Sequence, residues 1–173
     1  MAADPLPTKA EALKLLRDAN ATFHGLLGGL PPRAFTIPGI GGGEWSPKEL
    51  LAHMAYWELN ALEAIDAWER GDPAPIDLAL RADGLTAVNR DGLARMSKGS
   101  AAQVRERAEE VHGHLIDRMR SMPTRRWNMP PTPRGTRPLG LRIGSILGGP
   151  AGPFMHANAH LPDIEAFVQQ FAR

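Results

Sequence analysis

The feature of the sequence that most restricts its fold is a capped amphipathic segment that begins at Ser46 and continues to about Arg70. Ser46 and Glu49 form a Ser-x-x-Glu capping box, and Pro47 suits the first turn of a helix. Apolar side chains then recur at steps of three and four residues: Leu50, Met54, Trp57, Ala61, Ile65 and Trp68. Because such a helix gains most of its stability by burying its apolar face, the segment predicts packing against other helices.

Other parts of the chain follow the same helical period, and no segment shows the alternation of a strand or an internal repeat. The sequence predicts further helices over residues 8–27, 85–96, 100–122 and about 153–171. A glycine-rich loop at 31–45, a proline-punctuated crossover at 72–83 and an irregular stretch at 123–153 separate them. Within the last of these, residues 139–147 suit a short extended or single-turn piece.

These segments predict an all-α fold, a four-helix bundle with an extra short helix and a long irregular loop before the last helix. At 173 residues the chain is expected to form one domain over residues 1–173.

The composition favours some classes of protein over others. The chain has 20 basic and 19 acidic residues and a formal net charge of +1, so we expect no nucleic-acid partner. No apolar run approaches the ~20 residues of a membrane span, and the first residues lack a signal-peptide pattern, so we expect no membrane association and a cytoplasmic location. The chain has no cysteine. A metal ligand must therefore be His, Asp or Glu, and a reacting thiol must come from a small molecule.

Three histidines from two distant segments form the candidate metal site. His53 lies at the edge of the apolar face of the capped helix, and His156 and His160 stand one helical turn apart near the end of the chain. Three protein ligands with one open position are typical of a catalytic metal site. Imidazole suits zinc, nickel, copper or iron. In the alternative interpretation the histidines are satisfied by one another or by water.

Two stretches together resemble the DinB superfamily. They are Glu-Trp-Ser-Pro-Lys-Glu-Leu-Leu-Ala-His-Met-Ala-Tyr-Trp-Glu at residues 44–58 and His-Ala-Asn-Ala-His-Leu-Pro-Asp-Ile at residues 156–164. More narrowly, the chain is similar to the branch of mycothiol-dependent maleylpyruvate isomerases and thiol S-transferases. The resemblance implies an up-up-down-down four-helix bundle with a divalent ion at His53, His156 and His160. ClbS-type resistance proteins, which inactivate reactive natural products, form a cousin group.

The first hypothesis is a metal-dependent enzyme that acts on a small electrophilic molecule, as a thiol-dependent S-transferase or isomerase. A divalent metal, with zinc or nickel favoured, would lower the pKa of a low-molecular-weight thiol. Arg134, Arg137 and Arg142 are weak candidates for cofactor binding, because guanidinium groups suit carboxylates, and solvated loop charges are their plainer interpretation. Trp45 and Trp57 are interpreted as core anchors.

Three alternatives remain open at this point. A metal-activated water would make the same scaffold a hydrolase. A cleft between the helices could bind or sequester a small molecule without turnover, as in a resistance protein. The chain could also be a structural protein, and a homodimer is compatible with each of these hypotheses.

Overall fold

The computed structural model describes residues 7–133 and 135–171, and every regular element in that part of the chain is a helix. The elements are α1 (Lys9–Gly28), a short 3-10 helix (Pro32–Thr36), α2 (Pro47–Glu69), α3 (Pro75–Met96), α4 (Ala101–Ser121), α5 (Thr124–Trp127), α6 (Leu139–Ile146) and α7 (His156–Gln169). The all-α fold class is thereby confirmed. Within the described residues, no helix has both the length and the apolar character required to cross a membrane.

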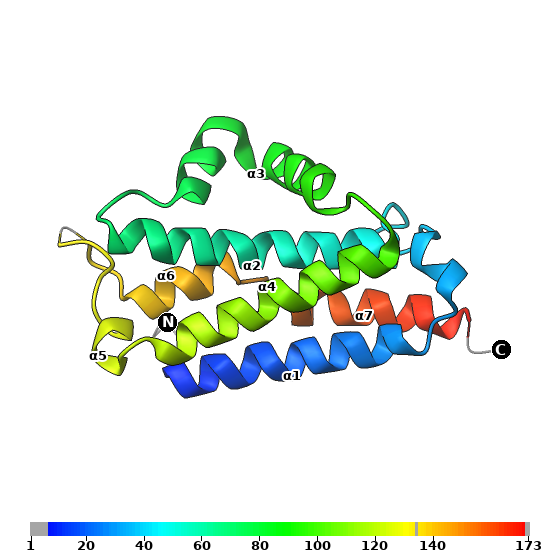
Figure 1. The fold of residues 1–173 in the computed structure, drawn as a ribbon, viewed down its shortest axis with the longest axis horizontal. Helices are drawn as coiled ribbons and strands as arrows, with labels where there is room; N and C mark the ends of the chain where they lie inside the picture. The colour runs from blue at the N-terminus through cyan, green and yellow to red at the C-terminus, as the bar shows by residue number, and fades with distance from the viewer. Residues whose placement is uncertain (1–6, 134, 172–173) are drawn as a thin grey trace.

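Helices α1, α2, α4 and α7 form the bundle, in which α1 packs mainly on α7 and α2 on α4 (Figure 1). The Lys9 ammonium at the start of α1 donates to the Met122 carbonyl just beyond the end of α4, so these two helices are antiparallel. Glu58 of α2 contacts His112 of α4, and Asp66, about two turns further along α2, contacts Arg118, so α2 and α4 are parallel.

In chain order the four bundle helices run up, down, down and up, which differs from the up-up-down-down order that the resemblance implied. The physical reason lies in the connections. A compact segment that contains the 3-10 helix turns the chain back between α1 and α2. Helix α3 then carries the chain along the outside of the bundle, so that α4 begins at the same end as α2 (Figure 1).

Side-chain caps fix where three of the bundle helices begin. Thr8, Ser46 and Ser100 each accept a hydrogen bond from the third residue of the following helix, and that residue's side chain accepts from the cap's backbone N–H. At α2, the Ser46 N–H donates to Glu49 Oε2 at 2.8 Å. The boxes predicted at Ser46 and Ser100 are confirmed.

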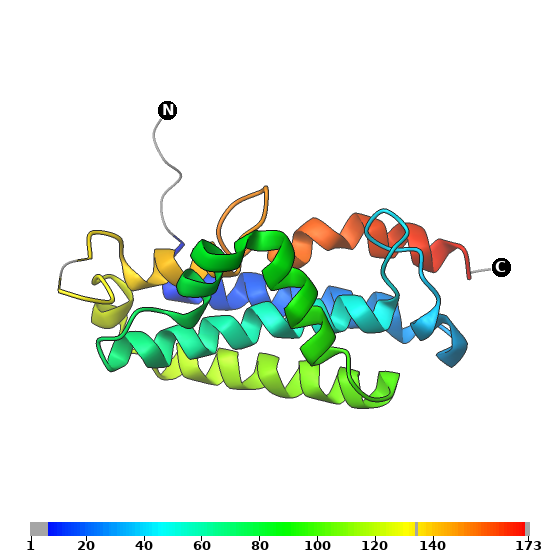
Figure 2. The same cartoon turned by 90° about the horizontal axis from the view of Figure 1, so that it is seen from above.

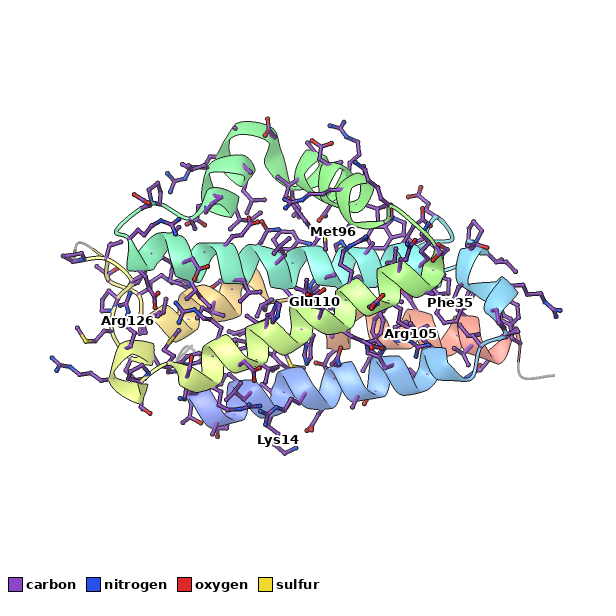
Figure 3. The ribbon with its side chains drawn as sticks, viewed as in Figure 1. Lys14, Phe35, Met96, Arg105, Glu110 and Arg126 are labelled. Atoms are coloured by element: carbon purple, nitrogen blue, oxygen red, sulfur yellow. The ribbon has the colours of Figure 1, made fainter. Side chains whose placement is uncertain are left out.

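Apolar side chains fill the bundle along its whole length. One cluster, which includes Trp68, Leu115 and Trp127, lies near the end where α5 and α6 pack, and a second, which includes Phe23, Leu50 and Phe167, lies near the other end. Charged side chains such as Lys14 project from the outer faces, while the Arg105 guanidinium lies 5.9 Å from the centre of the Phe35 ring (Figure 3).

The structure departs from the sequence-based expectation in two connecting segments. The predicted crossover at 72–83 is largely helical, because Pro75 occupies the first turn of α3, where a proline is tolerated. Helix α3 bends at Gly84, whose φ of 76° and ψ of 167° are not helical. The irregular stretch at 123–153 contains α5 and α6, and the latter is a helix of eight residues where a short extended or single-turn piece was expected.

Candidate functional site

His53, His156 and His160 converge beside the junction of α2 and α7. His156 Nε2 lies 3.0 Å from His53 Nε2 and 3.4 Å from His160 Nε2. One ring nitrogen from each residue lies within 4.8 Å of the others, and among the described residues this is the one group of His, Asp or Glu with such geometry. The structure therefore brings together the three histidines that the sequence singled out.

Helix α2 positions His53 at the inner wall of the site. The capping box fixes the start of the helix, and His53 lies about two turns further on with only 4 % of its surface exposed. The Trp45 ring lies 4.7 Å from the His53 ring, and the Trp57 ring lies 6.5 Å away at a near-perpendicular angle. These contacts hold the imidazole between two large aromatic surfaces.

The segment before α7 places His156 at the first residue of that helix. The His156 N–H donates to the Leu147 carbonyl at 3.0 Å, and the Phe154 N–H donates to the Gly144 carbonyl at 3.1 Å. Phe154 has a φ of 63°, a strained value for a residue with a side chain, and its buried ring stacks on Trp127. Because of this turn, the helix begins at His156 and not near the predicted residue 153.

Burial keeps the three imidazoles uncharged at neutral pH. It lowers the pKa of His53 to about 3, with smaller contributions from His156 and His160, and it lowers the pKa of His156 to about 4. Burial also lowers the pKa of His160, while the Asp163 carboxylate opposes that shift. Neutral imidazoles retain a lone pair, which is the form that ligates metals.

The donor set and its spacing fit a divalent ion. Nitrogen ligands of a tetrahedral zinc ion at about 2.0–2.1 Å lie about 3.3 Å from one another. The separations of 3.0 and 3.4 Å between Nε2 atoms are close to that value. Lone pairs that face one another at such short range repel unless a proton or a metal ion lies between them, so this arrangement is suited to cation binding.

The triad opens on a cleft of about 800 Å³, which we call the triad cleft. Trp45 and Trp57 form one wall, so both tryptophans interpreted as core anchors also face the cleft. The Trp57 Nε1–H donates to Asn89 Oδ1 of α3 at 3.1 Å. Leu80 and Leu85 of α3 and the loop between α6 and α7 line the cleft, and Figure 2 shows this loop beside α3.

The arginine candidates occupy different positions. Arg134 lies outside the described residues. Arg137 and Arg142 both line the triad cleft. Arg142 forms an ion pair with Asp77 and lies 5.3 Å above the Trp68 ring, while Arg137 donates to Ser145 Oγ at 3.2 Å. These two guanidinium groups are therefore placed beside the same cleft as the histidines.

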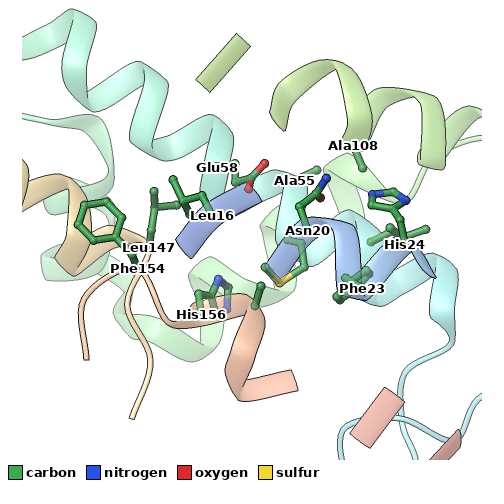
Figure 4. Close-up of a pocket in the computed structure, with 13 residues that line it drawn as sticks. Leu16, Asn20, Phe23, His24, Ala55, Glu58, Ala108, Leu147, Phe154 and His156 are labelled. Atoms are coloured by element: carbon green, nitrogen blue, oxygen red, sulfur yellow. The ribbon is translucent and has the colours of Figure 1, made fainter. Parts of the chain in front are cut away.

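A second cavity, of about 30 Å³, lies behind His156 in the interior of the bundle (Figure 4). Asn20, His24 and Glu58 supply polar groups to an otherwise largely apolar lining. The Glu58 carboxylate lies 2.8 Å from His112 Nδ1, and both residues are more than nine-tenths buried. This pair was not predicted from the sequence, because residues on two separate helices have no characteristic spacing. The only signal was a histidine and a glutamate beside the apolar stripes of their helices.

Solved structures of similar fold cover nearly the whole chain. An uncharacterised protein from Escherichia coli UTI89 has a TM-score of 0.78 at 16% identity, over 96% of this chain and 95% of that one. A protein from Streptococcus pneumoniae has a TM-score of 0.65 at 11% identity, over 98% and 93%. The colibactin self-resistance protein ClbS, in complex with double-stranded DNA, has a TM-score of 0.60 at 13% identity, over 97% and 95%. No curated protein matches the sequence.

The ClbS complex corrects one expectation from composition. A net charge near zero led us to exclude nucleic-acid partners, and this exclusion is wrong, because a protein of the same fold binds duplex DNA. Net charge is a sum over the whole chain, whereas phosphate contacts depend on the local arrangement of basic side chains.

A protein-family model provides the assignment of the chain. The model that describes the DinB superfamily matches residues 5–148, which include α1 to α6 and His53 and end before His156 and His160. The match covers most of the sequence, and the structural neighbours share the fold along nearly the full length of the chain. The chain belongs to the DinB superfamily.

Proposed function

We propose that this protein is a divalent-metal-dependent enzyme that transfers a low-molecular-weight thiol to a small electrophile, or isomerises such a molecule with the thiol's help. His53, His156 and His160 would hold the ion, with zinc and nickel as the favoured metals. The single observation that carries the proposal is the convergence of three neutral imidazole nitrogens beside an open cleft. The similarity to mycothiol-dependent isomerases and S-transferases in the two histidine-bearing stretches also supports it.

In the proposed reaction, the metal ion and the side chains of the protein would have different roles. When bound, a divalent ion lowers the pKa of a thiol ligand and so supplies a nucleophile at neutral pH. In a transfer reaction the thiol proton would pass to solvent, the thiol sulfur would bond to an electrophilic carbon, and the leaving group would depart with the electrons of its bond.

The side chains around the triad would orient the reactants and exclude water. The Trp45 and Trp57 rings pack beside His53 and present flat apolar surfaces to the cleft. Asn89 accepts a hydrogen bond from Trp57, which fixes the ring of that tryptophan against α3. Because the chain has no cysteine, the reacting thiol would be a free small molecule.

Elemental analysis of the purified protein tests the metal part of the proposal. We expect close to one equivalent of zinc or nickel per chain, and we expect it to be lost in a variant that combines His53→Ala and His156→Ala. His114→Ala is the matched control, because His114 is an exposed histidine of α4 away from the triad. Equal metal content in the wild type and the double variant would contradict the proposal.

A mass-spectrometric assay tests the reaction. Electrophiles are incubated with candidate thiols, with and without the protein, and the thiol adduct or the isomerised product is measured. We expect the protein to accelerate product formation, and we expect the acceleration to depend on His53 and His156.

Similarity of fold to ClbS supports a second candidate, a resistance protein that binds or sequesters a reactive small molecule without turnover. Binding of an electrophile at one equivalent per chain, with no product and no dependence on added metal, would favour this candidate over the enzyme.

A further inference from the structure

A pocket of about 420 Å³ lies next to the triad cleft, and arginines dominate its charge. We call it the arginine pocket. It is lined by Trp68, Asp77, Arg81, Thr136, Arg137 and Arg142, among others. Asp77, Arg137 and Arg142 also line the triad cleft, so the two depressions share a wall. A ligand in the triad cleft can therefore extend toward the arginine pocket.

Within the part of the chain that the structure describes, two guanidinium groups of the arginine pocket have no acidic partner. Asp77 pairs with Arg142, and Asp72, the other carboxylate in the lining, pairs with Arg70 at 3.3 Å. Among the described residues, no Asp or Glu lies within ion-pair distance of Arg81 or Arg137. A concave surface with uncompensated guanidinium groups attracts carboxylates and phosphates.

Specific contacts orient the two arginines of the shared wall. The Arg142 guanidinium lies 5.3 Å above the Trp68 ring while it pairs with Asp77. Arg137 donates to Ser145 Oγ, and the Ser145 hydroxyl in turn donates to the Leu141 carbonyl of α6 at 2.8 Å. A group that is already oriented loses less conformational entropy when it binds a ligand.

The distance between the histidine triad and the arginine pocket sets the length of a ligand that would reach both sites. His53 and Trp68 stand fifteen residues apart on α2, or about 22 Å at 1.5 Å per residue. Arg137 approaches the triad more closely, because it contacts Ser145, two residues before the Leu147 carbonyl that accepts from His156. The span from the triad to the arginines is therefore on the order of 10–20 Å, which is longer than a simple thiol such as cysteine.

We propose that the arginine pocket anchors the remote anionic group of an elongated thiol, through Arg137 and with help from Arg81, while the sulfur of that thiol reaches the histidine triad. This inference rests on the proposed function and narrows its cosubstrate to a thiol whose far end carries a carboxylate or a phosphate.

Isothermal titration calorimetry on the zinc-loaded protein tests this inference with two pairs of probes. Mercaptoundecanoate is compared with mercaptoundecanol, and phosphopantetheine with pantetheine, so that one member of each pair ends in an anion and the other in a hydroxyl group. We expect the charged member of at least one pair to bind about tenfold more tightly. The pair that shows the preference identifies the anion as a carboxylate or a phosphate. Mercaptopropionate, which is too short to span the distance, should bind independently of Arg137.

Amino-acid substitutions test which residues cause the preference for the charged probes. Arg137→Gln should abolish the preference for the charged probe, and Arg125→Gln, at an exposed arginine of α5, should leave it intact. A variant that combines Asp77→Asn with Arg142→Gln removes the ion pair as a unit, keeps Arg81 and Arg137, and should therefore retain the preference. Circular dichroism checks that each variant is folded. Equal affinities within both pairs, or a preference that persists in Arg137→Gln, would overturn the inference.

The same titrations separate this inference from the proposed function. If the charged probes keep their Arg137-dependent preference in the His53→Ala, His156→Ala variant, the anchor stands and the role of the triad in thiol binding fails. If all long thiols need the triad and the terminal charge has no effect, the proposed function stands and the anchor fails.

Discussion

At the scale of single residues, the histidine triad combines burial with short separations between nitrogen atoms. His53 and His156 have pKa values of about 3 and about 4 because burial disfavours their charged forms. In the unfolded chain a histidine titrates near 6.5. At a pH between the pKa of the folded state and that of the unfolded state, these histidines bind protons in the unfolded chain but not in the folded one. The two histidines should therefore contribute their full stabilisation above about pH 6.5. As the pH falls below that value, the free energy of unfolding should decrease.

This dependence can be measured by urea denaturation of the metal-free protein at about pH 7 and about pH 5. We expect the wild type to lose more stability over this interval than a His53→Gln, His156→Gln variant, because the variant lacks the two groups that must be buried uncharged. His114→Gln serves as the control and should behave as the wild type does. Equal losses in the wild type and the double variant would show that these histidines do not control the acid response.

Glu58 and His112 form a buried polar pair, and we expect it to stabilise the fold. Glu58→Ala leaves His112 Nδ1 without an acceptor in the interior, and we expect a loss of about 1–3 kcal/mol in the free energy of unfolding. Glu58→Gln keeps an acceptor of similar size and should retain most of that stability. Asp117→Ala, which breaks the exposed pair with Arg120, is the control and should have little effect. Equal losses from Glu58→Ala and Asp117→Ala would contradict this role.

The sequence predicts part of the site at this scale. A histidine on an apolar helix edge and a terminal pair four residues apart are visible as patterns, and the structure brings these three residues together. The Glu58–His112 contact depends on how α2 and α4 are set against each other, which no local spacing encodes. Asp163 is exposed, and the charge of its carboxylate opposes the lowering of the His160 pKa by burial.

At the scale of elements, the capping box at Ser46 fixes the start of the helix that carries His53. Ser46→Ala should reduce the free energy of unfolding by about 1 kcal/mol, because it removes the acceptor for the Glu49 N–H. Ser121→Ala is the control, because the Ser121 hydroxyl donates within the last turn of α4 and caps no helix start. Chemical denaturation measures both variants, and a Ser46→Ala effect as small as that of the control would argue against the cap.

Glycine has opposite roles in α3 and α4. A Cβ at Gly92 would lie 2.3 Å from the Tyr56 ring, so Gly92→Ala should push α3 away from α2 and destabilise the protein. A Cβ at Gly113 meets nothing within 4 Å, so Gly113→Ala should raise the free energy of unfolding by about 0.5–1 kcal/mol. Thermal denaturation compares the two, and stabilisation by Gly92→Ala would refute the close packing of α3 on α2.

The long helices were predictable because each combines a start signal with an apolar stripe. The first half of α3 was missed because Pro73 and Pro75 read as loop residues, although Pro75 lies at a helix start. The start of α7 was placed too early, because the left-handed conformation of Phe154 has no signal in the sequence. That conformation depends on the tertiary packing of its ring against Trp127.

At the scale of the whole molecule, the bundle brings together groups from distant parts of the chain. The triad cleft joins α2, α3, α6 and α7, and the arginines beside it come from a segment that the sequence treats as an irregular loop. The net charge of +1 is a sum over the whole chain. It therefore gives no sign of the local excess of guanidinium groups in the arginine pocket. The fold class follows from local patterns, whereas the direction of each helix and the surface charge follow from the tertiary arrangement.

The central claim is that one divalent ion binds at the meeting point of the three imidazoles. Anomalous diffraction from crystals of the metal-loaded protein, recorded at the absorption edge of the bound metal, tests it most directly. We expect one peak per chain, about 2.0–2.1 Å from the Nε2 atoms of His53, His156 and His160, with an open position toward the triad cleft. A metal-loaded crystal without this peak, or with the peak bound by other residues, would contradict the claim.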